Sequence, residues 1–219
     1  MAILTWDETG QHWGETGVSN GVIYTRSGPS TGYDKAAAWN GLTAVNQEPE
    51  GAEPQDFYAD NILYLSLLSA EKWKATIEAF TYPDMFAKCD GTAQVASGPM
   101  FVGQQDRVPF GFSWQTKIVN DTQATAAGTM IHVAYGCLAS PSSKNAQTIN
   151  DSPEITNFSW SVTGTPVNVP NMKPSAYLKF DSRKSTPEQW KDLTDALYGT
   201  SGVDAKLPTP AEIIELLNT

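Results

Sequence analysis

Basic residues and cysteines are scarce in this sequence of 219 residues. There are 14 lysines and arginines against 24 aspartates and glutamates, so the formal net charge is −10. Tight nucleic-acid binding needs a basic surface, and anionic membranes attract the same charge, so both classes of partner are disfavoured. The two cysteines, Cys89 and Cys137, are too few for a disulfide framework, and two free buried thiols are the favoured interpretation.

Long apolar runs are also missing. Residues 1–8 have neither the basic region nor the apolar stretch of a signal peptide, and no run approaches the ~20 apolar residues of a membrane span. We therefore expect a protein made in a reducing cytosol. Hydrophobic residues still make up 40% of the chain and aromatic residues 11%. This is enough to bury the core of one large β domain or of two small ones.

Catalytic and metal-binding motifs are absent as well. The chain contains no G-x-S-x-G, CxxC, P-loop, G-x-G-x-x-G or HExxH pattern, so we expect no enzyme and no cofactor. Glu8, His12 and Glu15 have a loosely metal-like spacing, but a further ligand on a rigid element is missing, and we predict no metal there. His132 lies in an apolar run, and a packed or channel-lining side chain is favoured over a catalytic base.

The stretch from Val108 to Leu138 carries the clearest pattern. Apolar residues alternate with small or polar ones in two runs, which indicates strands with one packed face. A polar connector, residues 120–128, separates the runs and predicts an antiparallel hairpin with a long loop. The apolar faces comprise Phe110, Phe112, Trp114 and Ile118 in the first run, and Ile131, Val133, Tyr135 and Cys137 in the second.

The other segments complete a mainly β fold. Strands are predicted at 21–26, 36–45, 57–69, 73–82, 156–163 and 176–180, a short helix at 83–91 and a long polar loop at 139–154. In the C-terminal segment 186–219, Thr186 with Gln189 and Thr209 with Glu212 predict two capped helices that begin with proline. Strands followed by helices indicate a β-sandwich with helical additions.

Seven short segments spread over the chain are characteristic of one family. They are Glu15–Val18, Gly21–Tyr24, Ala38–Val45, Tyr58–Ile62, Ala75–Asp84, Cys89–Gly91 and Thr148–Pro153. On these segments, from about residue 5 to 217, the chain resembles the major tail proteins of phages with long non-contractile tails. The resemblance implies a single tail tube domain over 1–219, with two packed antiparallel sheets, a short flanking helix and the C-terminal helices.

The resemblance also implies the function of a structural virion protein. Such subunits form hexameric rings that stack into a tube, through which DNA passes without specific binding. The implied partners are other copies of the chain, the tape measure protein, the tail terminator and the distal tail proteins. The protein would be located in the virion, after assembly in the host cytoplasm. Two alternatives stay open: the inner tube protein of a contractile tail or secretion apparatus, and a monomeric carbohydrate-binding sandwich with Trp6, Trp13 and Trp39 as its platform.

Two sets of residues are candidate sites in a tube. The segment 46–56 is predicted to be an extended loop that cannot form a ladder and is ordered only against a neighbouring subunit. Its acidic residues would pair with Lys72, Lys74 or Arg107 of the next copy, and its interface candidates are Glu48, Pro49, Glu50, Glu53, Pro54 and Asp56. Polar strand faces predict a neutral or acidic channel lining, with Ser113, Gln115, Lys117, Ser159, Ser161 and Thr163 as candidates.

Overall fold

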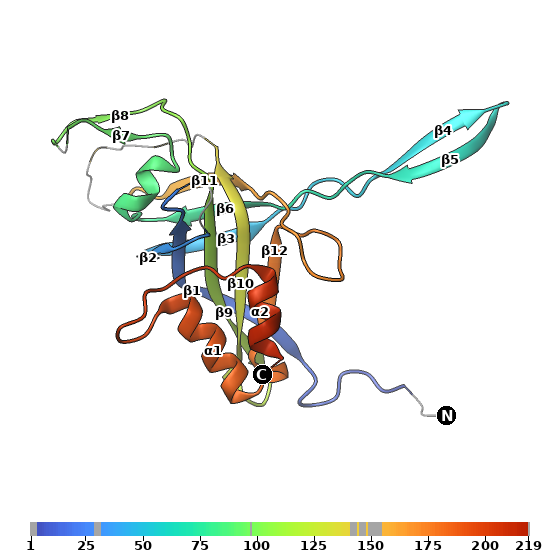
Figure 1. Cartoon of the computed structure of the whole chain (residues 1–219). Coiled ribbons are helices and arrows are strands. Elements are labelled where there is room, and N and C mark those ends of the chain that lie inside the picture. The colour runs from blue at the N-terminus through green and yellow to red at the C-terminus, as the bar shows by residue number, and fades with distance from the viewer. Residues whose placement is uncertain are drawn as a thin grey trace.

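The computed structural model describes residues 4–28, 32–96, 98–140, 144, 148 and 155–218. The fold is mainly β, with one large antiparallel sheet folded into two layers, two smaller sheets and two short α-helices (Figure 1). The prediction of two packed antiparallel sheets with a short flanking helix and C-terminal helices is confirmed. The large sheet is not closed into a barrel, because its strand order ends at β2 on one side and at β3 on the other.

The first layer contains the longest strands. Its order is β2 (Lys35–Trp39), β1 (Trp13–Thr25), β9 (Phe110–Asn120), β10 (Ala124–Ala139) and β12 (Tyr177–Asp181). The hairpin of β9 and β10 is confirmed, but its predicted long connector is wrong. Only residues 121–123 form the turn, because the chain from Ala124 onward already pairs with β9 through an irregular register. The second layer consists of β11 (Phe158–Thr163), β6 (Lys74–Ala79) and β3 (Leu42–Gln47).

Strand β10 belongs to both layers and changes partner at Gly136. Residues Met130–Ala134 pair with β12, whereas Leu138 and Ala139 pair with β11. Gly136 has φ +57°, and a Cβ there would lie 2.8 Å from the Thr165 side chain. Glycine meets both requirements without strain. The irregularity also turns Cys137 to the opposite face from Ile131, Val133 and Tyr135, so the prediction that all four share a face is wrong.

The main core lies between the two layers and is rich in aromatic side chains. Trp39 makes edge or tilted contacts with Phe86, Phe112 and Trp160 at ring-centroid distances of 4.5 to 5.6 Å. These offset geometries are the favourable ones for aromatic pairs. Phe86 comes from the short 3-10 helix η1 (Asp84–Lys88), the flanking helix that Pro83 and Gly91 predicted. Cys89 and Cys137 are both buried in this core as free thiols, which confirms that prediction.

The helices cover the other face of the first layer. Helix α1 (Pro187–Tyr198) and helix α2 (Pro210–Leu217) both begin with the predicted capping boxes, on Thr186 and Thr209. Leu193 and Leu197 of α1 and Ile213 of α2 pack against a second buried cluster. On the sheet side the second buried cluster is formed by Val22, Tyr24, Ile131, Val133 and Tyr135. A second 3-10 turn, η2 (Ser182–Lys184), links β12 to α1.

Two predicted strands are each divided by a turn. The segment 36–45 is interrupted at Asn40 and Gly41 (φ +77°), where the chain leaves the first layer and enters the second. The segment 57–69 is interrupted at Asp60 and Asn61, which have φ +52° and +63°. It forms a two-stranded sheet of β4 (Pro54–Ala59) and β5 (Ile62–Leu68). The third sheet pairs β7 (Ala93–Gln94) with β8 (Phe101–Val102), and most of the predicted loop 139–154 lies outside the described residues.

Candidate subunit interface

A two-stranded arm, residues 48–72, projects from the body of the subunit (Figure 1). The hairpin pairs Pro54 with Leu68 at its base and Ala59 with Ile62 next to the tip. The two positive φ values at Asp60 and Asn61 correspond to a type I′ turn, the connection whose twist matches that of paired strands. Asp and Asn tolerate this left-handed conformation better than most residues.

The root of the arm is held by contacts within the same chain. Glu50 and Lys72 exchange two backbone hydrogen bonds of 2.9 and 2.7 Å, and the Glu50 carboxylate forms an ion pair with Lys74. This contact holds the pKa of the Glu50 carboxyl below its ordinary value, chiefly through the hydrogen bond that Lys74 donates. The expectation that Lys72 and Lys74 would serve a neighbouring copy is therefore wrong for Glu50, because its partner is intramolecular.

The predicted loop 46–56 is divided among three elements. Asn46 and Gln47 end β3, residues 48–53 form the root, and Pro54–Asp56 begin β4. The expectation that this segment cannot form a ladder is wrong. Pro54 is tolerated because it stands at the first position of an edge strand, where its missing N–H leaves no sheet bond unmade. The six interface candidates, Glu48, Pro49, Glu50, Glu53, Pro54 and Asp56, are all exposed.

Large apolar side chains cover both faces of the arm. Directly paired residues share a face, and the register shift between Phe57 and Tyr58 divides the leucines of β5 between the two faces. The leucine face consists of Phe57, Ile62, Leu65 and Leu67. The tyrosine face consists of Tyr58, Leu63 and Leu68. Relative exposures are 44% to 64% on the leucine face and 52% to 75% on the tyrosine face. The arm stands clear of the body (Figure 1) and carries more exposed large apolar side chains than any other segment of the described chain.

The six predicted channel residues lie on two different surfaces. Ser113 is fully buried beneath α1, where its hydroxyl meets Tyr24 Oη at 3.0 Å, so it cannot line a channel in this fold. Gln115 is half-buried and donates to Tyr198 Oη at 2.9 Å, while Lys117 is exposed. Sequence alternation identified the polar face of β9 but could not show that a helix covers it. Ser159, Ser161 and Thr163 lie instead on the outer face of the second layer, half-buried or exposed.

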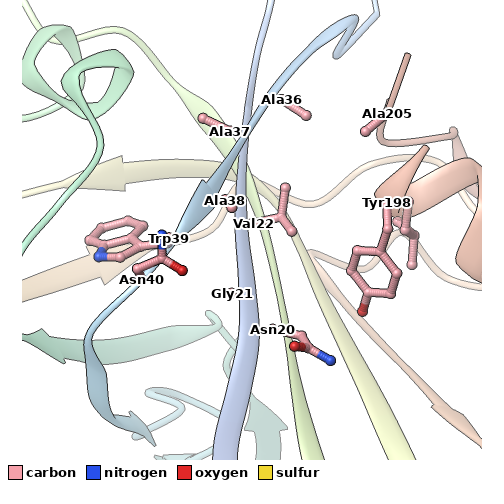
Figure 2. A pocket seen from close by; sticks show the side chains of 11 residues that line it. Asn20, Gly21, Val22, Ala36, Ala37, Ala38, Trp39, Asn40, Tyr198 and Ala205 are labelled. Atoms are coloured by element: carbon pink, nitrogen blue, oxygen red, sulfur yellow. The ribbon is translucent and has the colours of Figure 1, made fainter. Parts of the chain in front are cut away.

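An open groove of about 490 Å³ lies between β1, β2 and the C-terminal end of α1 (Figure 2). Its lining is mostly small and apolar, with Val22 and Ala36 on the sheet and Ala205 opposite. Tyr198 enters from the helix side, and burial raises the pKa of its hydroxyl to about 12. Among the described residues that line the groove, none is a histidine, cysteine, carboxylate or lysine. The groove therefore offers no pair of groups for acid–base chemistry near neutral pH.

No protein-family model matches the chain, and no curated protein matches it. Among solved structures, the chain is similar to the tube-terminating cap of an anti-feeding prophage, with 5% identity and a TM-score of 0.42 over 83% of this chain and 97% of that one. It is also similar to a chain of the sheath–tube complex of an extracellular contractile injection system in its extended state. That match has 8% identity and a TM-score of 0.35, over 74% of this chain and 88% of the other.

The aromatic platform of the carbohydrate-binding alternative is not assembled. Trp39 is 2% exposed and belongs to the main core, whereas Trp6 is 76% exposed on the N-terminal segment. Trp13 lies at the start of β1 beneath the Arg183 guanidinium, 4.4 Å from its ring centroid. The three rings therefore form no common surface.

The histidines and their acidic neighbours are separated as well. His12 Nδ1 lies 3.0 Å from Asp121, and His12 Nε2 lies 3.8 Å from Asp7. Glu15 is directed instead toward His132, at 3.7 Å. Over the described residues no group of three or more histidine, cysteine or acidic side chains is placed to hold a metal ion, and no helix is long and apolar enough to cross a membrane.

Proposed function

We propose that this chain is the repeating subunit of a phage-type tail tube, which assembles with copies of itself into stacked hexameric rings around a channel for DNA. The arm is the observation that carries the proposal. A two-stranded hairpin is marginally stable in water by itself, and this one exposes seven large apolar side chains on its leucine and tyrosine faces. Exposed apolar patches of this kind mark protein–protein contact sites. The sequence resemblance to phage major tail proteins supports the same function.

The two apolar faces determine how the arm is used. Burying one leucine-sized side chain contributes about 1.5–3 kcal/mol, whereas association costs roughly 4–15 kcal/mol in lost freedom of movement. Several arm residues must therefore become buried for each contact. A single flat surface would cover only one face and leave the other in water. The arm is therefore inserted between two neighbouring copies, one on its leucine face and one on its tyrosine face.

Ring closure uses the open edges of the large sheet. Strands β2 and β3 end the strand order and are joined by the turn at Asn40 and Gly41, so both layers present an edge at the same corner. Unpaired edges are templates for pairing with another chain. A head-to-tail contact that uses this corner closes into a ring when the rotation between copies is a whole fraction of a turn.

The channel lining in this proposal is the outer face of the second layer. There Ser159 is paired with Glu78, and Ser161 with Thr76. Thr163 is paired with Lys74, whose charge is already neutralised by Glu50. The resulting face is neutral to acidic. DNA can slide along such a face, because lysine and arginine contacts with phosphates would hold it by counterion release. Gln115 and Lys117 belong to the helix side and lie away from this lining.

The proposed tube also implies the other partners and the location of the protein. The tape measure protein, the tail terminator and the distal tail proteins would contact the ends or the interior, and the assembled protein would be part of a virion. The inner tube of a contractile tail or secretion apparatus would need the same arm and sheet edges. Electron micrographs of whole particles distinguish the two functions, since only the contractile system surrounds the tube with a sheath.

The test replaces one face of the arm at a time. One variant carries Ile62→Ser, Leu65→Ser and Leu67→Ser on the leucine face, and the other carries Tyr58→Ser, Leu63→Ser and Leu68→Ser on the tyrosine face. We expect the unaltered chain to form tubes in negative-stain micrographs as its concentration rises, and neither variant to do so. The unfolding temperature of the monomer should barely change, because the arm does not pack on the body.

Met172→Ser is the matched control, because Met172 is 75% exposed on a loop outside the arm. This variant should assemble normally. An unaltered chain that stays monomeric at all concentrations, or normal tubes from both triple variants, would refute the proposed function. Normal tubes from only one triple variant would show that a single face is buried and would refute the insertion between two copies.

A further inference from the structure

A continuous run of side-chain hydrogen bonds connects the root of the arm to the far side of the first layer. Trp73 Nε1 donates to Gln47 Oε1 at 3.2 Å, and Gln47 Nε2 donates to Tyr177 Oη at 3.3 Å. The Tyr177 hydroxyl lies 2.7 Å from His132 Nδ1, and His132 Nε2 lies 2.9 Å from Thr116 Oγ1. The run ends where Thr116 Oγ1 donates to Glu15 Oε2 at 3.1 Å.

The chemistry of the two ends fixes the direction of every bond in the run. An indole N–H only donates, so Gln47 must accept from Trp73 with its oxygen and donate to Tyr177 with its nitrogen. Tyr177 then uses its single proton toward His132 Nδ1. At the other end a carboxylate only accepts, so the one proton of Thr116 points to Glu15 and His132 Nε2 must donate to Thr116. Both ends require the same neutral tautomer of His132, with the proton on Nε2.

Stacked rings hold the central members in place. The His132 ring lies on Trp114 with a centroid distance of 4.9 Å and an interplanar angle of 7°. The Tyr177 ring lies on Trp73 at 6.1 Å and 10°. His132 is 3% exposed and Trp73 is 8% exposed, whereas Gln47 and Glu15 are exposed, so only the central part of the run around His132 is shielded from water. Side-chain networks whose members are all satisfied rigidify a structure, most strongly where they are shielded from water.

The position of the run relates it to the arm. Gln47 is the last residue of β3, and Trp73 directly precedes β6, so the chain enters and leaves the arm beside these two residues. Tyr177, His132, Thr116 and Glu15 lie on β12, β10, β9 and β1, the four strands next to each other in the first layer. The run therefore anchors both strands at the arm's root to a rigid sheet.

We propose that these six residues form a latch that fixes the direction in which the arm leaves the subunit, with the bond from Tyr177 to His132 as its central link. The latch is a property of the isolated subunit, and only its consequence for assembly rests on the proposed function. An arm held in one direction loses less conformational freedom when it inserts between neighbours, which is the general advantage of preorganisation. Tyr177, His132 and Gln47 are thus positioning residues for the interface.

Spin-label distances in the unassembled full-length chain test the latch. Nitroxide labels on Ala59→Cys, exposed next to the arm tip, and on Lys191→Cys on the exposed side of α1 report the direction of the arm, while native Cys89 and Cys137 are buried. Tyr177→Phe removes only the hydroxyl and keeps the ring stacks. Gln47→Leu cuts the run at an exposed position, where folding is not at risk. Thr43→Val is the control, because it removes a β3 hydrogen bond to Asn157 that lies outside the run.

We expect the distribution of distances between the two labels to become at least about twice as broad in Tyr177→Phe and in Gln47→Leu, because the arm is then free to change direction. In the Thr43→Val control the distribution should stay unchanged. Nitrogen NMR of the unaltered chain should show His132 protonated on Nε2 only. Unchanged distributions in both latch variants, or a His132 proton on Nδ1, would overturn the latch. Where tubes form, losing one network bond worth about 0.5–1.5 kcal/mol should raise the critical concentration roughly 2- to 10-fold. The labels are read on monomers, so a failure of tube formation leaves this test intact.

Discussion

Acidification of the subunit should remove stability through His132, and the size of the loss follows from its surroundings. Burial lowers the pKa of His132 from the ordinary value of 6.5 to about 4. The nearby Glu15 carboxylate opposes this shift, and the Lys179 ammonium on β12 adds to it. The other ring neighbours, Trp114 and Tyr177, do not ionise in this range. Protonation would also place a hydrogen on Nδ1, where Tyr177 already points its own proton.

The sign and magnitude follow from proton linkage. Because the folded pKa lies below the unfolded one, the unfolded chain binds the proton more readily between about pH 6.5 and pH 4. The contribution is fully present above pH 6.5 and is lost as the pH falls toward 4. A shift from 6.5 to about 4 corresponds to about 3 kcal/mol at 1.36 kcal/mol for each pKa unit. Between pH 7 and pH 5 the loss should be about 2 kcal/mol, a large part of a typical folding free energy of 5–15 kcal/mol.

Urea unfolding at a series of pH values measures this loss, with His132→Gln as the comparison. Glutamine keeps one acceptor and one donor but does not titrate. The free energy of unfolding of the unaltered chain should fall by about 2 kcal/mol more than that of the variant between pH 7 and pH 5. This range stays above the isoelectric point of about 4.6. The matched control is His12→Gln at an exposed position, which should keep the steep pH dependence. Parallel curves for the unaltered chain and His132→Gln would show that His132 is not held neutral in the fold.

Four further predictions concern separate parts of the chain. Thr186→Ala removes the N-cap of α1 and should cost about 1 kcal/mol in urea unfolding, while Leu197→Ala in the helix-side core should cost about 2–5 kcal/mol. Cys89 and Cys137 should react with thiol reagents only when the chain unfolds, because both are buried and burial raises the pKa of Cys89 to about 12; fast labelling of the native protein would contradict this. Asn61→Gly should preserve the arm, and Asn61→Val should increase amide exchange along β4 and β5, because a β-branched residue is strained at φ +63°.

Local signals in the sequence were sufficient for much of the fold. The period of two located β9, β10, β11 and β12, and the capping boxes at Thr186 and Thr209 located both helices. These patterns depend on a few neighbouring residues, so they can be recognised without knowledge of the tertiary structure. The turn at Asp60 and Asn61 that divides 57–69 was not predicted. The clearest sequence signals for a turn with two positive φ values are Asn-Gly and Asp-Gly pairs, and this turn contains no glycine.

Features that depend on contacts between distant segments could not be predicted from the sequence. Ser113 alternates with apolar residues as a channel residue would, and only the packing of α1 shows that it is buried. The alternation of Leu63, Leu65 and Leu67 was read as an ordinary strand, since a sequence does not show whether another layer covers the face. The His132 latch was missed for the same reason, because its members come from six separate segments. Glycine at position 136 was the one available signal for the partner change in β10.

The composition of β5 has a consequence for the behaviour of the isolated chain. Its seven residues, Ile62–Leu68, contain no charge, no proline and no glycine, and six of them are large and apolar. Short segments of this kind on an exposed edge readily stack with identical copies into cross-β aggregates. Asp56 lies on the paired strand β4 and Asp60 lies in the turn. In a stack of identical copies these carboxylates would lie close to their own counterparts, and the repulsion between like charges opposes stacking. The exposed arm therefore makes the isolated chain prone to fibre-like aggregation, and burial of β5 against another surface would remove this tendency.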